Sequence, residues 1–288
     1  MDWKRAMKNR VLIAIPLLIF LLASIVFSAL PCFESTIWHD IPLLLFITLF
    51  TSFCIYEFAH VFAKNGSRPL SLPAYVLTIT HAFVLYFLGT TAFVIEYFVC
   101  IIASVIGLVL RRRNEHSSMI VSMYFYIYPI AFLSSAALTF TYFSRPYGLL
   151  GLCIILLVPI FTDTFAYFGG YFFGRHKLIP EISPKKTIEG AVFGIIGGTL
   201  LSILLIIAQQ LIGADLKWYY MLPICFIVSV LCQFGDLFAS MFKRWANVKD
   251  YSNLFQNHGG AMDRSDSIMF SAPIVFCCFL ILNYFKVI

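Results

Sequence analysis

Long apolar stretches dominate this chain and are separated by short polar breaks. A helix that crosses a bilayer needs about 20 consecutive apolar residues, and it satisfies its own backbone hydrogen bonds in lipid. The pattern therefore predicts an all-α, polytopic transmembrane helical bundle of about nine spans by that length criterion. The predicted spans lie near residues 11–30, 41–63, 70–88, 91–110, 119–141, 148–172, 190–212, 219–242 and 267–286.

The composition agrees with a membrane protein. Hydrophobic residues make up 61% of the chain and charged residues only 12%, whereas soluble domains are usually about 25% charged. The first apolar run is longer than the roughly 7–15 residues of a signal-peptide core, so we expect it to be a retained span. We treat the chain as a single membrane domain, with N-terminal transmembrane helices in 1–147 and a C-terminal catalytic region in 148–288.

The positions of the basic residues predict the orientation. If nine spans alternate, every Lys and Arg except Arg145, Lys217 and Lys286 falls on the same side. Basic residues are retained on the cytoplasmic side during insertion, so we expect a cytoplasmic N-terminus and a C-terminus outside. The net charge of +6 then belongs to a face that meets lipid headgroups or a phosphorylated substrate, and we expect no nucleic-acid partner.

Four carboxylates fall inside or at the ends of the predicted spans. Such groups cost several kcal/mol in a bilayer unless they are paired or hydrated, so each is a functional candidate. Glu57 and Glu96 lie toward span ends, where a structural role is favoured. Asp163 lies well within its span and predicts a polar cavity. Asp236 shares a helix face with Ser240, Lys243 and Arg244, a stripe that suits a metal-bound phosphate, with an interfacial ion pair as the alternative.

Two longer cytosolic segments, 173–189 and 243–266, carry the remaining candidate chemistry. Gly259 and Gly260 free the backbone to present N–H groups to an anion. Asp263 and Asp266 follow at i, i+3 on one helical face, and together with Asp236 they are oxygen ligands suited to Mg²⁺.

The first of these segments contains Ser183-Pro184-Lys185-Lys186-Thr187 and leads into a predicted helix. Two lysines and a hydroxyl at a helix N-terminus predict a phosphate site. The alternative is a cluster of positive charge that only directs membrane insertion. Such a cluster would require the two lysines but would leave the threonine hydroxyl unexplained. Gly190, Gly194 and Gly198 then form one stripe, which predicts close helix packing, with helix mobility near a substrate as the alternative.

Three ordered motifs resemble those of the phosphatidate cytidylyltransferases, the CDP-diacylglycerol synthases. The first runs from Asp163-Thr164 to Gly174-Arg175, and the second is Ser183-Pro184-Lys185-Lys186-Thr187 with Glu189-Gly190. The third joins Ser240-xx-Lys243-Arg244 to His258-Gly259-Gly260-xx-Asp263-Arg264-x-Asp266. The resemblance covers roughly 160–270, with departures at Ser252, Gln256-Asn257 and Ser265.

The resemblance implies that the phosphate of phosphatidic acid attacks the α-phosphorus of CTP, giving CDP-diacylglycerol and pyrophosphate. As hypotheses, Asp236 and Asp263 ligate Mg²⁺, and Asp266 supports them or holds a second cation. Lys243 stabilises the transferring phosphoryl group and Ser240 contacts phosphate. Substrate binding is assigned to Asp163, Ser183, Lys185, Lys186, Thr187, Arg244, His258, Gly259, Gly260 and Arg264.

Two other functions remain open at this point. A CTP-dependent kinase of polyprenol or phytol would use similar loops, and a transporter could use Asp163 and Asp236 as coupling carboxylates. We expect a multi-pass protein of a bacterial inner (plasma) membrane, with the active site on the cytoplasmic side. The sequence leaves the oligomeric state open, and a homodimer is compatible with it.

Overall fold

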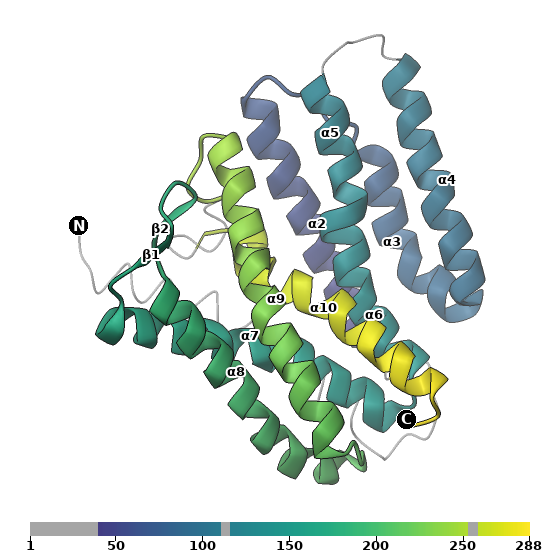
Figure 1. The fold of residues 1–288 in the computed structure, drawn as a ribbon. Helices are drawn as coiled ribbons and strands as arrows, with labels where there is room; N and C mark the ends of the chain where they lie inside the picture. The colour runs from purple at the N-terminus through teal and green to yellow at the C-terminus, as the bar shows by residue number, and fades with distance from the viewer. Residues whose placement is uncertain (1–39, 111–115, 253–258) are drawn as a thin grey trace, which may run out of the picture. The chain divides into compact units, whose positions relative to one another are not determined.

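Apolar helices build the protein (Figure 1). The computed structural model describes residues 40–110, 116–252 and 259–288. Seven helical segments within these residues are long and apolar enough to cross a membrane, so the chain is a multi-pass membrane protein. These segments are α2 (Ile41–Lys64), α4 (Gly89–Leu110), His116–Tyr142, α7 (Arg145–Phe173), Ile188–Ile212, α9 (Trp218–Trp245) and α10 (Ala261–Tyr284).

Two of the nine predicted spans are not among these seven. The first, near 11–30, lies outside the described residues. The third corresponds to α3 (Leu72–Phe87), which has 16 residues. At 1.5 Å per residue α3 is about 24 Å long, shorter than the roughly 30 Å hydrocarbon core. The count of nine and the sidedness of the two termini therefore stay predictions.

The span predicted at 119–141 is a composite helix. It consists of α5 (His116–Phe125), a π-helical stretch η2 (Tyr126–Ala131) and α6 (Phe132–Tyr142). Pro129 lies inside η2 and has no N–H to donate, and the wider π turn accommodates it. The buried Tyr126 hydroxyl in this stretch lies 2.6 Å from Ser104 Oγ and donates to the Cys100 carbonyl at 3.0 Å.

By their internal contacts the residues form two compact units. Of the described residues, the first contains 40–110, 116–137, 250–252 and 259–264, and the second contains 138–249 and 265–288. In the second unit α7 packs against α8 (Ile188–Ala208) along the predicted glycine stripe. A Cβ on Gly190 would lie 2.7 Å from the Ala166 carbonyl, and one on Gly194 would lie 2.9 Å from the Thr162 carbonyl. The close packing expected from the glycine spacing is thus confirmed. The division at residue 147 stays a prediction.

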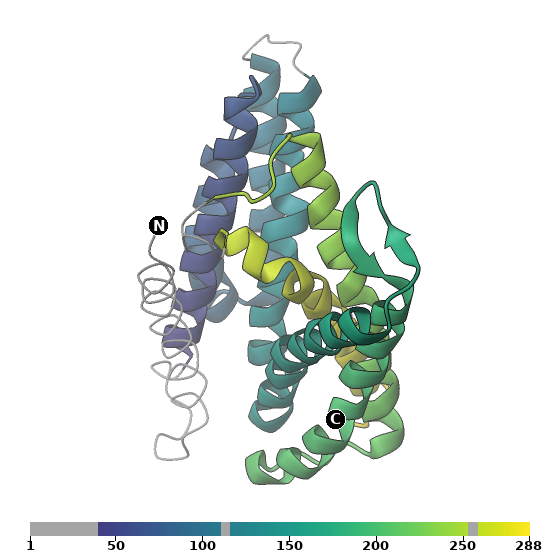
Figure 2. The same cartoon turned by 90° about the vertical axis from the view of Figure 1, so that its left-hand side faces the viewer.

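A short β-hairpin connects α7 to α8 (Figure 2). Strands β1 (Lys177–Ile179) and β2 (Ser183–Thr187) are antiparallel, with Lys177 opposite Thr187. The Ile188 N–H donates to the His176 carbonyl at 3.0 Å, so the ladder continues up to the first residue of α8. The sequence indicated only a basic cytosolic segment here, and in the structure the hairpin holds Lys185, Lys186 and Thr187 on one strand.

Candidate active site

A cavity of about 390 Å³ lies in the second unit, between α7, the hairpin, α8 and α9. Its volume is within the range of about 300–1,000 Å³ that is usual for ligand pockets. Asp163 and Tyr167 line it from α7, and Gln233 and Asp236 line it from α9. Five of the predicted site residues lie on its wall: Asp163, Lys185, Lys186, Thr187 and Asp236.

An ion pair crosses this cavity. Lys186 Nζ lies 2.5 Å from Asp236 Oδ2, and the two side chains are 25% and 27% exposed. Gly235 allows the neighbouring helices to approach, because a Cβ there would lie 2.7 Å from the backbone carbonyl of Asp266. The small residue before Asp236 therefore lets α9 approach α10 at Asp266.

Asp266 is a second carboxylate close to Asp236. Its buried carboxylate lies 4.0 Å from Lys243 Nζ, and its Oδ1 accepts the Ser267 N–H at 2.8 Å. The Ser267 hydroxyl donates to Asp163 Oδ2 at 3.0 Å. Asp266 also interacts electrostatically with both Asp163 and Asp236. The second unit thus gathers three carboxylates and two lysines in one place.

The hairpin enters α8 through a well-formed N-cap. Thr187 Oγ1 accepts the Gly190 N–H at 3.1 Å, as a threonine at a helix start should. A hydroxyl can accept and donate at once, so this one can still offer its proton to a ligand. The Glu189 carboxylate contacts residues that precede it in the chain. It accepts the Arg175 N–H at 3.1 Å and lies 2.7 Å from His176 Nδ1. Glu189 therefore fixes the chain where it leaves α7.

In the first unit a buried carboxylate caps the start of α10. Glu57 is 2% exposed and accepts the N–H groups of Ala261 and Met262, each at 2.9 Å. The Ser252 hydroxyl donates to the same carboxylate at 2.5 Å. A side chain on Gly260 would collide with it. The structural role favoured for Glu57 is confirmed, and its partner is the positive end of a helix, not a cation.

The Asp263 carboxylate accepts two further backbone N–H groups near the start of α10. Its Oδ2 accepts the N–H groups of Tyr251 and Gly260, both at 2.9 Å. Gly259 has a φ of +79°, the left-handed conformation expected for a glycine turn here. The backbone N–H groups of residues 260–262 thus bind internal carboxylates of the protein. The metal-binding role of Asp263 stays a prediction.

The other predicted site residues lie on these same elements. Ser240 is half-buried on α9, one turn after Asp236, and Ser183 begins β2. Arg244 Nε donates to the Ile182 carbonyl at 3.3 Å, so this guanidinium holds the hairpin. Arg264 is exposed on α10. His258 lies outside the described residues.

Two polar contacts of this site were not anticipated from the sequence. Ser267 bonds to Asp163, and Gln233 Nε2 donates to the Ser229 carbonyl at 3.1 Å while its side chain lines the cavity. Ser267 directly follows Asp266, and Gln233 precedes Asp236 by three residues, so nearness to a predicted carboxylate was the only available signal.

The donor set fits a hard divalent cation shared with a substrate. No group of three or more His, Cys, Asp or Glu side chains within the described residues could by itself hold a metal ion. Mg²⁺ seldom needs such a group, because it usually binds one or two carboxylates and completes its octahedron with water and substrate phosphates. Asp236 and Asp266, with Asp163 beside them, meet that requirement.

The class of protein follows from comparison with known families. The model of the cytidylyltransferase family matches residues 8–282, nearly the whole chain. The chain therefore belongs to the cytidylyltransferase family.

Individual relatives narrow the comparison. A protein of Staphylococcus epidermidis named phosphatidate cytidylyltransferase is 40% identical over 139 residues, which are 47% of this chain and 52% of that protein. A protein of the same name from Bacillus subtilis is 40% identical over 130 residues, 45% of this chain and 47% of that protein. The matched segments thus span about half the length of these relatives.

Proposed function

We propose that the chain is a phosphatidate cytidylyltransferase, which converts CTP and phosphatidic acid into CDP-diacylglycerol and pyrophosphate. The observation that carries this proposal is the cavity that Lys185, Lys186, Asp163 and Asp236 line together. Cations and carboxylates on one wall suit a polyphosphate together with its metal. The relatives that carry this name support the same activity.

The reaction needs no nucleophile from the protein. An ionised phosphate oxygen of phosphatidic acid attacks the α-phosphorus of CTP and forms the new P–O bond. The bond between the α-phosphorus and the oxygen that bridges to the β-phosphate breaks, and pyrophosphate leaves with the electron pair. Binding, orientation and charge stabilisation are the work of the protein in phosphoryl transfer.

The lysines are assigned by their position. Lys185 and Lys186 lie on the cavity wall beside the capped start of α8, so we assign them to the triphosphate. Lys243 lies near Asp266, and we assign it to the transferring phosphoryl group. Ser240, one turn from Asp236 on α9, would contact phosphate. Asp163 would keep the deep end of the cavity polar and hold Ser267.

Asp236 and Asp266 are the residues that we expect to hold Mg²⁺, with Asp263 as the further ligand that the motif implies. When bound, Mg²⁺ would neutralise charge on the triphosphate and on the departing pyrophosphate. The carboxylates of the protein need only keep the cation against the phosphates. A second cation, held through Asp266, belongs to the same proposal.

The distribution of charge supports a cytoplasmic site. Lys185, Lys186, Lys243 and Arg244 belong to the breaks that the basic residues assign to the cytoplasm. CTP would then reach the cavity from the cytoplasm, and phosphatidic acid would reach it from the inner leaflet. Since the relatives are bacterial, we assign the protein to a bacterial plasma membrane.

Incorporation of labelled cytidine into lipid tests the proposal. Purified full-length protein is incubated with Mg²⁺ and with CTP labelled in the cytosine ring, with and without phosphatidic acid. We expect label in the chloroform phase only with phosphatidic acid, and one pyrophosphate released per CMP transferred. Release of CDP with a polyprenol or phytol acceptor would instead identify a kinase. Absence of both products with properly folded protein would overturn the enzymatic proposal.

A further inference from the structure

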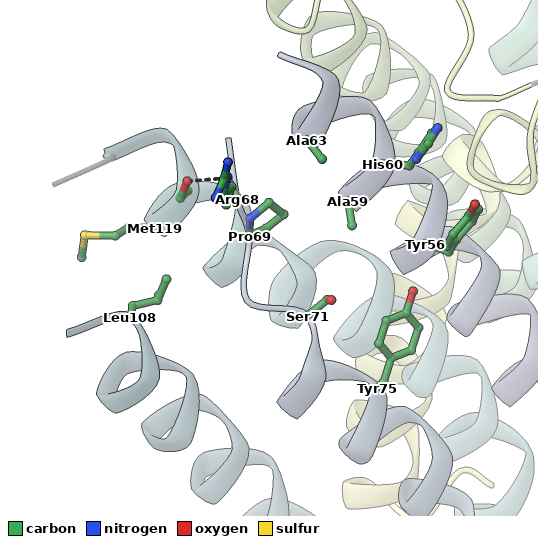
Figure 3. A pocket seen from close by; sticks show the side chains of 11 residues that line it. Tyr56, Ala59, His60, Ala63, Arg68, Pro69, Ser71, Tyr75, Leu108 and Met119 are labelled. Carbon is green, nitrogen blue, oxygen red and sulfur yellow. Dashed lines mark hydrogen bonds between the residues drawn. The ribbon is translucent and has the colours of Figure 1, made fainter. Parts of the chain in front are cut away.

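A second, larger cavity lies in the first unit. It encloses about 650 Å³, and its lining side chains come from α2, the connection between α2 and α3, α3, α4 and α5 (Figure 3). None of the residues assigned above to the active site lines it. The cavity therefore calls for an explanation separate from cytidylyl transfer.

The polar groups of this cavity suit an anion. Arg68 supplies a guanidinium, His60 an imidazole, and Tyr56 and Tyr75 supply phenolic hydroxyls. Ser71 adds a hydroxyl where α3 begins, at the positive end of that helix. Among the described residues that line the cavity none is acidic. Arginine with nearby hydroxyls is a combination that recognises phosphate.

The segment that carries Arg68 is held firmly in place. The Arg68 N–H donates to Ser118 Oγ and the Leu70 N–H donates to Ser122 Oγ, both at 2.8 Å (Figure 3 shows the first). Leu70 packs so tightly over α4 that a Cβ on Gly107 would lie 2.5 Å from it. Two serines of α5 and one glycine of α4 therefore preorganise the backbone, which lowers the entropy lost when a ligand binds.

The apolar part of the cavity indicates a lipid. Leu108 of α4 and Met119 of α5 line it as well, on the side away from Tyr56 and His60 (Figure 3). Within the described residues only 17% of the apolar stretch of α4 is buried, and an uncovered apolar helix face suits contact with acyl chains. Val105 and Val109, next to Leu108, are exposed. An occupant that extends from the polar groups along α4 would have both a charged head and apolar chains.

We propose that this cavity is an accessory site for an anionic membrane phospholipid, whose phosphate binds Arg68 and the hydroxyls of Tyr75 and Ser71. The acyl chains of this lipid lie against Leu108 and the exposed face of α4. The site holds the lipid as a bound ligand and carries out no chemistry on it. Basic residues near the ends of spans lie at the level of the lipid phosphates, which places the headgroup within reach.

Lipid binding to the purified full-length protein tests this inference. The probe is dioleoyl phosphatidylglycerol, which is neither substrate nor product of the proposed reaction, and dioleoyl phosphatidylcholine is the zwitterionic comparison. Native mass spectrometry counts bound lipids and titration gives the Kd. We expect Arg68→Gln to weaken phosphatidylglycerol binding by at least about tenfold, because the phosphate loses its charged hydrogen-bond donor. Tyr75→Phe should weaken it less, and Lys217→Gln, in a different loop, should leave it unchanged.

Each outcome decides the proposal. Equal affinity for phosphatidylglycerol in Arg68→Gln, Tyr75→Phe and the unmodified protein would mean unspecific annular lipid and would overturn the site. Equal binding of phosphatidylcholine would remove the anion requirement and overturn it as well. Glycerol 3-phosphate and inorganic phosphate form a third arm. If either bound as tightly as the lipid and displaced it, the ligand would be a free phosphate and the lipid assignment would be wrong.

Discussion

Lys186 on the hairpin and Asp236 on α9 form a direct ion pair across the cavity, with Nζ and Oδ2 2.5 Å apart. Fifty residues separate them in the chain, yet each is the nearest charged partner that the structure gives to the other. A half-buried pair of this kind leaves both groups ready to change partner. In the proposed reaction the lysine would turn to a phosphate of CTP and the carboxylate would turn to the cation.

Replacing Asp236 by Asn should stop cytidylyl transfer while the protein still inserts into the membrane. Asn keeps the shape but loses the negative charge that would hold the cation, so we expect kcat to fall by roughly 10²–10³, as for other electrostatic contributions to catalysis. Incorporation of labelled CTP into lipid measures it. Asp215→Asn is the matched control, because Asp215 is an exposed carboxylate that pairs with Lys217. Near-normal turnover of Asp236→Asn at saturating Mg²⁺ would refute the metal-binding role.

Replacing Lys186 by Gln should lower the catalytic efficiency with CTP as substrate. The substitution removes a cation from the cavity wall, and we expect kcat/KM for CTP to fall by about 10²-fold, the scale of one lost charge contact in a transition state. Lys177→Gln changes a lysine on the opposite strand of the same hairpin that does not line the cavity. If both variants lost activity equally, the effect would come from the hairpin as a whole and the assignment of Lys186 would fail.

Chelation of divalent cations should abolish turnover, and Mg²⁺ should restore it. The carboxylates of Asp236 and Asp266 would otherwise face the triphosphate without a cation between them, and like charges repel. Activity is followed after treatment with EDTA and again after graded addition of Mg²⁺. Full activity in the chelator, with residual metal excluded by elemental analysis, would contradict the metal requirement.

Glu57→Gln should destabilise the start of α10. The amide keeps the size of the side chain but loses the charge that two N–H groups and the Ser252 hydroxyl now bind. Charge-assisted hydrogen bonds contribute about 1.5–3 kcal/mol. We therefore expect the free energy of unfolding, measured in mixed micelles, to fall by about 2 kcal/mol. Glu181→Gln, at an exposed glutamate in the turn of the hairpin, serves as the control. Equal stability of Glu57→Gln and the unmodified protein would argue against a structural cap.

Gly198→Ala should loosen the packing of α8. A Cβ there would collide with the Thr162 hydroxyl and lie 2.5 Å from Ser229 Oγ. Overpacking costs typically about 1–3 kcal/mol, which unfolding of the purified variant in mixed micelles would detect. Leu200→Ala on the exposed side of α8 should change stability far less. A Gly198→Ala protein as stable as the original would show that α8 can move away from α7 and α9 at no cost in stability.

Sequence reasoning succeeded where the signal was local. Helical spans follow from apolar length, and the spacing of Gly190, Gly194 and Gly198 predicted the close approach of α8 to α7. Thr187 was singled out as a hydroxyl beside two lysines at a predicted helix start, and Asp236 as a charged residue in an apolar run. Both signals are visible in a few neighbouring residues. These features need no knowledge of what lies opposite in space.

Features that depend on distant partners were out of reach. The hairpin has strands of only three and five residues, and it is held by Arg244, which follows 62 residues after Ile182. The cap that Glu57 provides joins residues 204 positions apart. Helix α10 begins at Ala261 instead of near 267. Its polar first turn hides the start from a hydropathy criterion, and the carboxylate that stabilises that turn comes from α2.

The seam between α7 and α8 has an evolutionary consequence. The two helices meet there with backbone against backbone, since Gly190 adjoins the Ala166 carbonyl and Gly194 adjoins the Thr162 carbonyl. A carbonyl cannot be trimmed by mutation, so no substitution on α7 can make room for a larger residue on α8. Homologous chains should therefore keep these two glycines together, and any lineage that loses one should show a shifted helix axis.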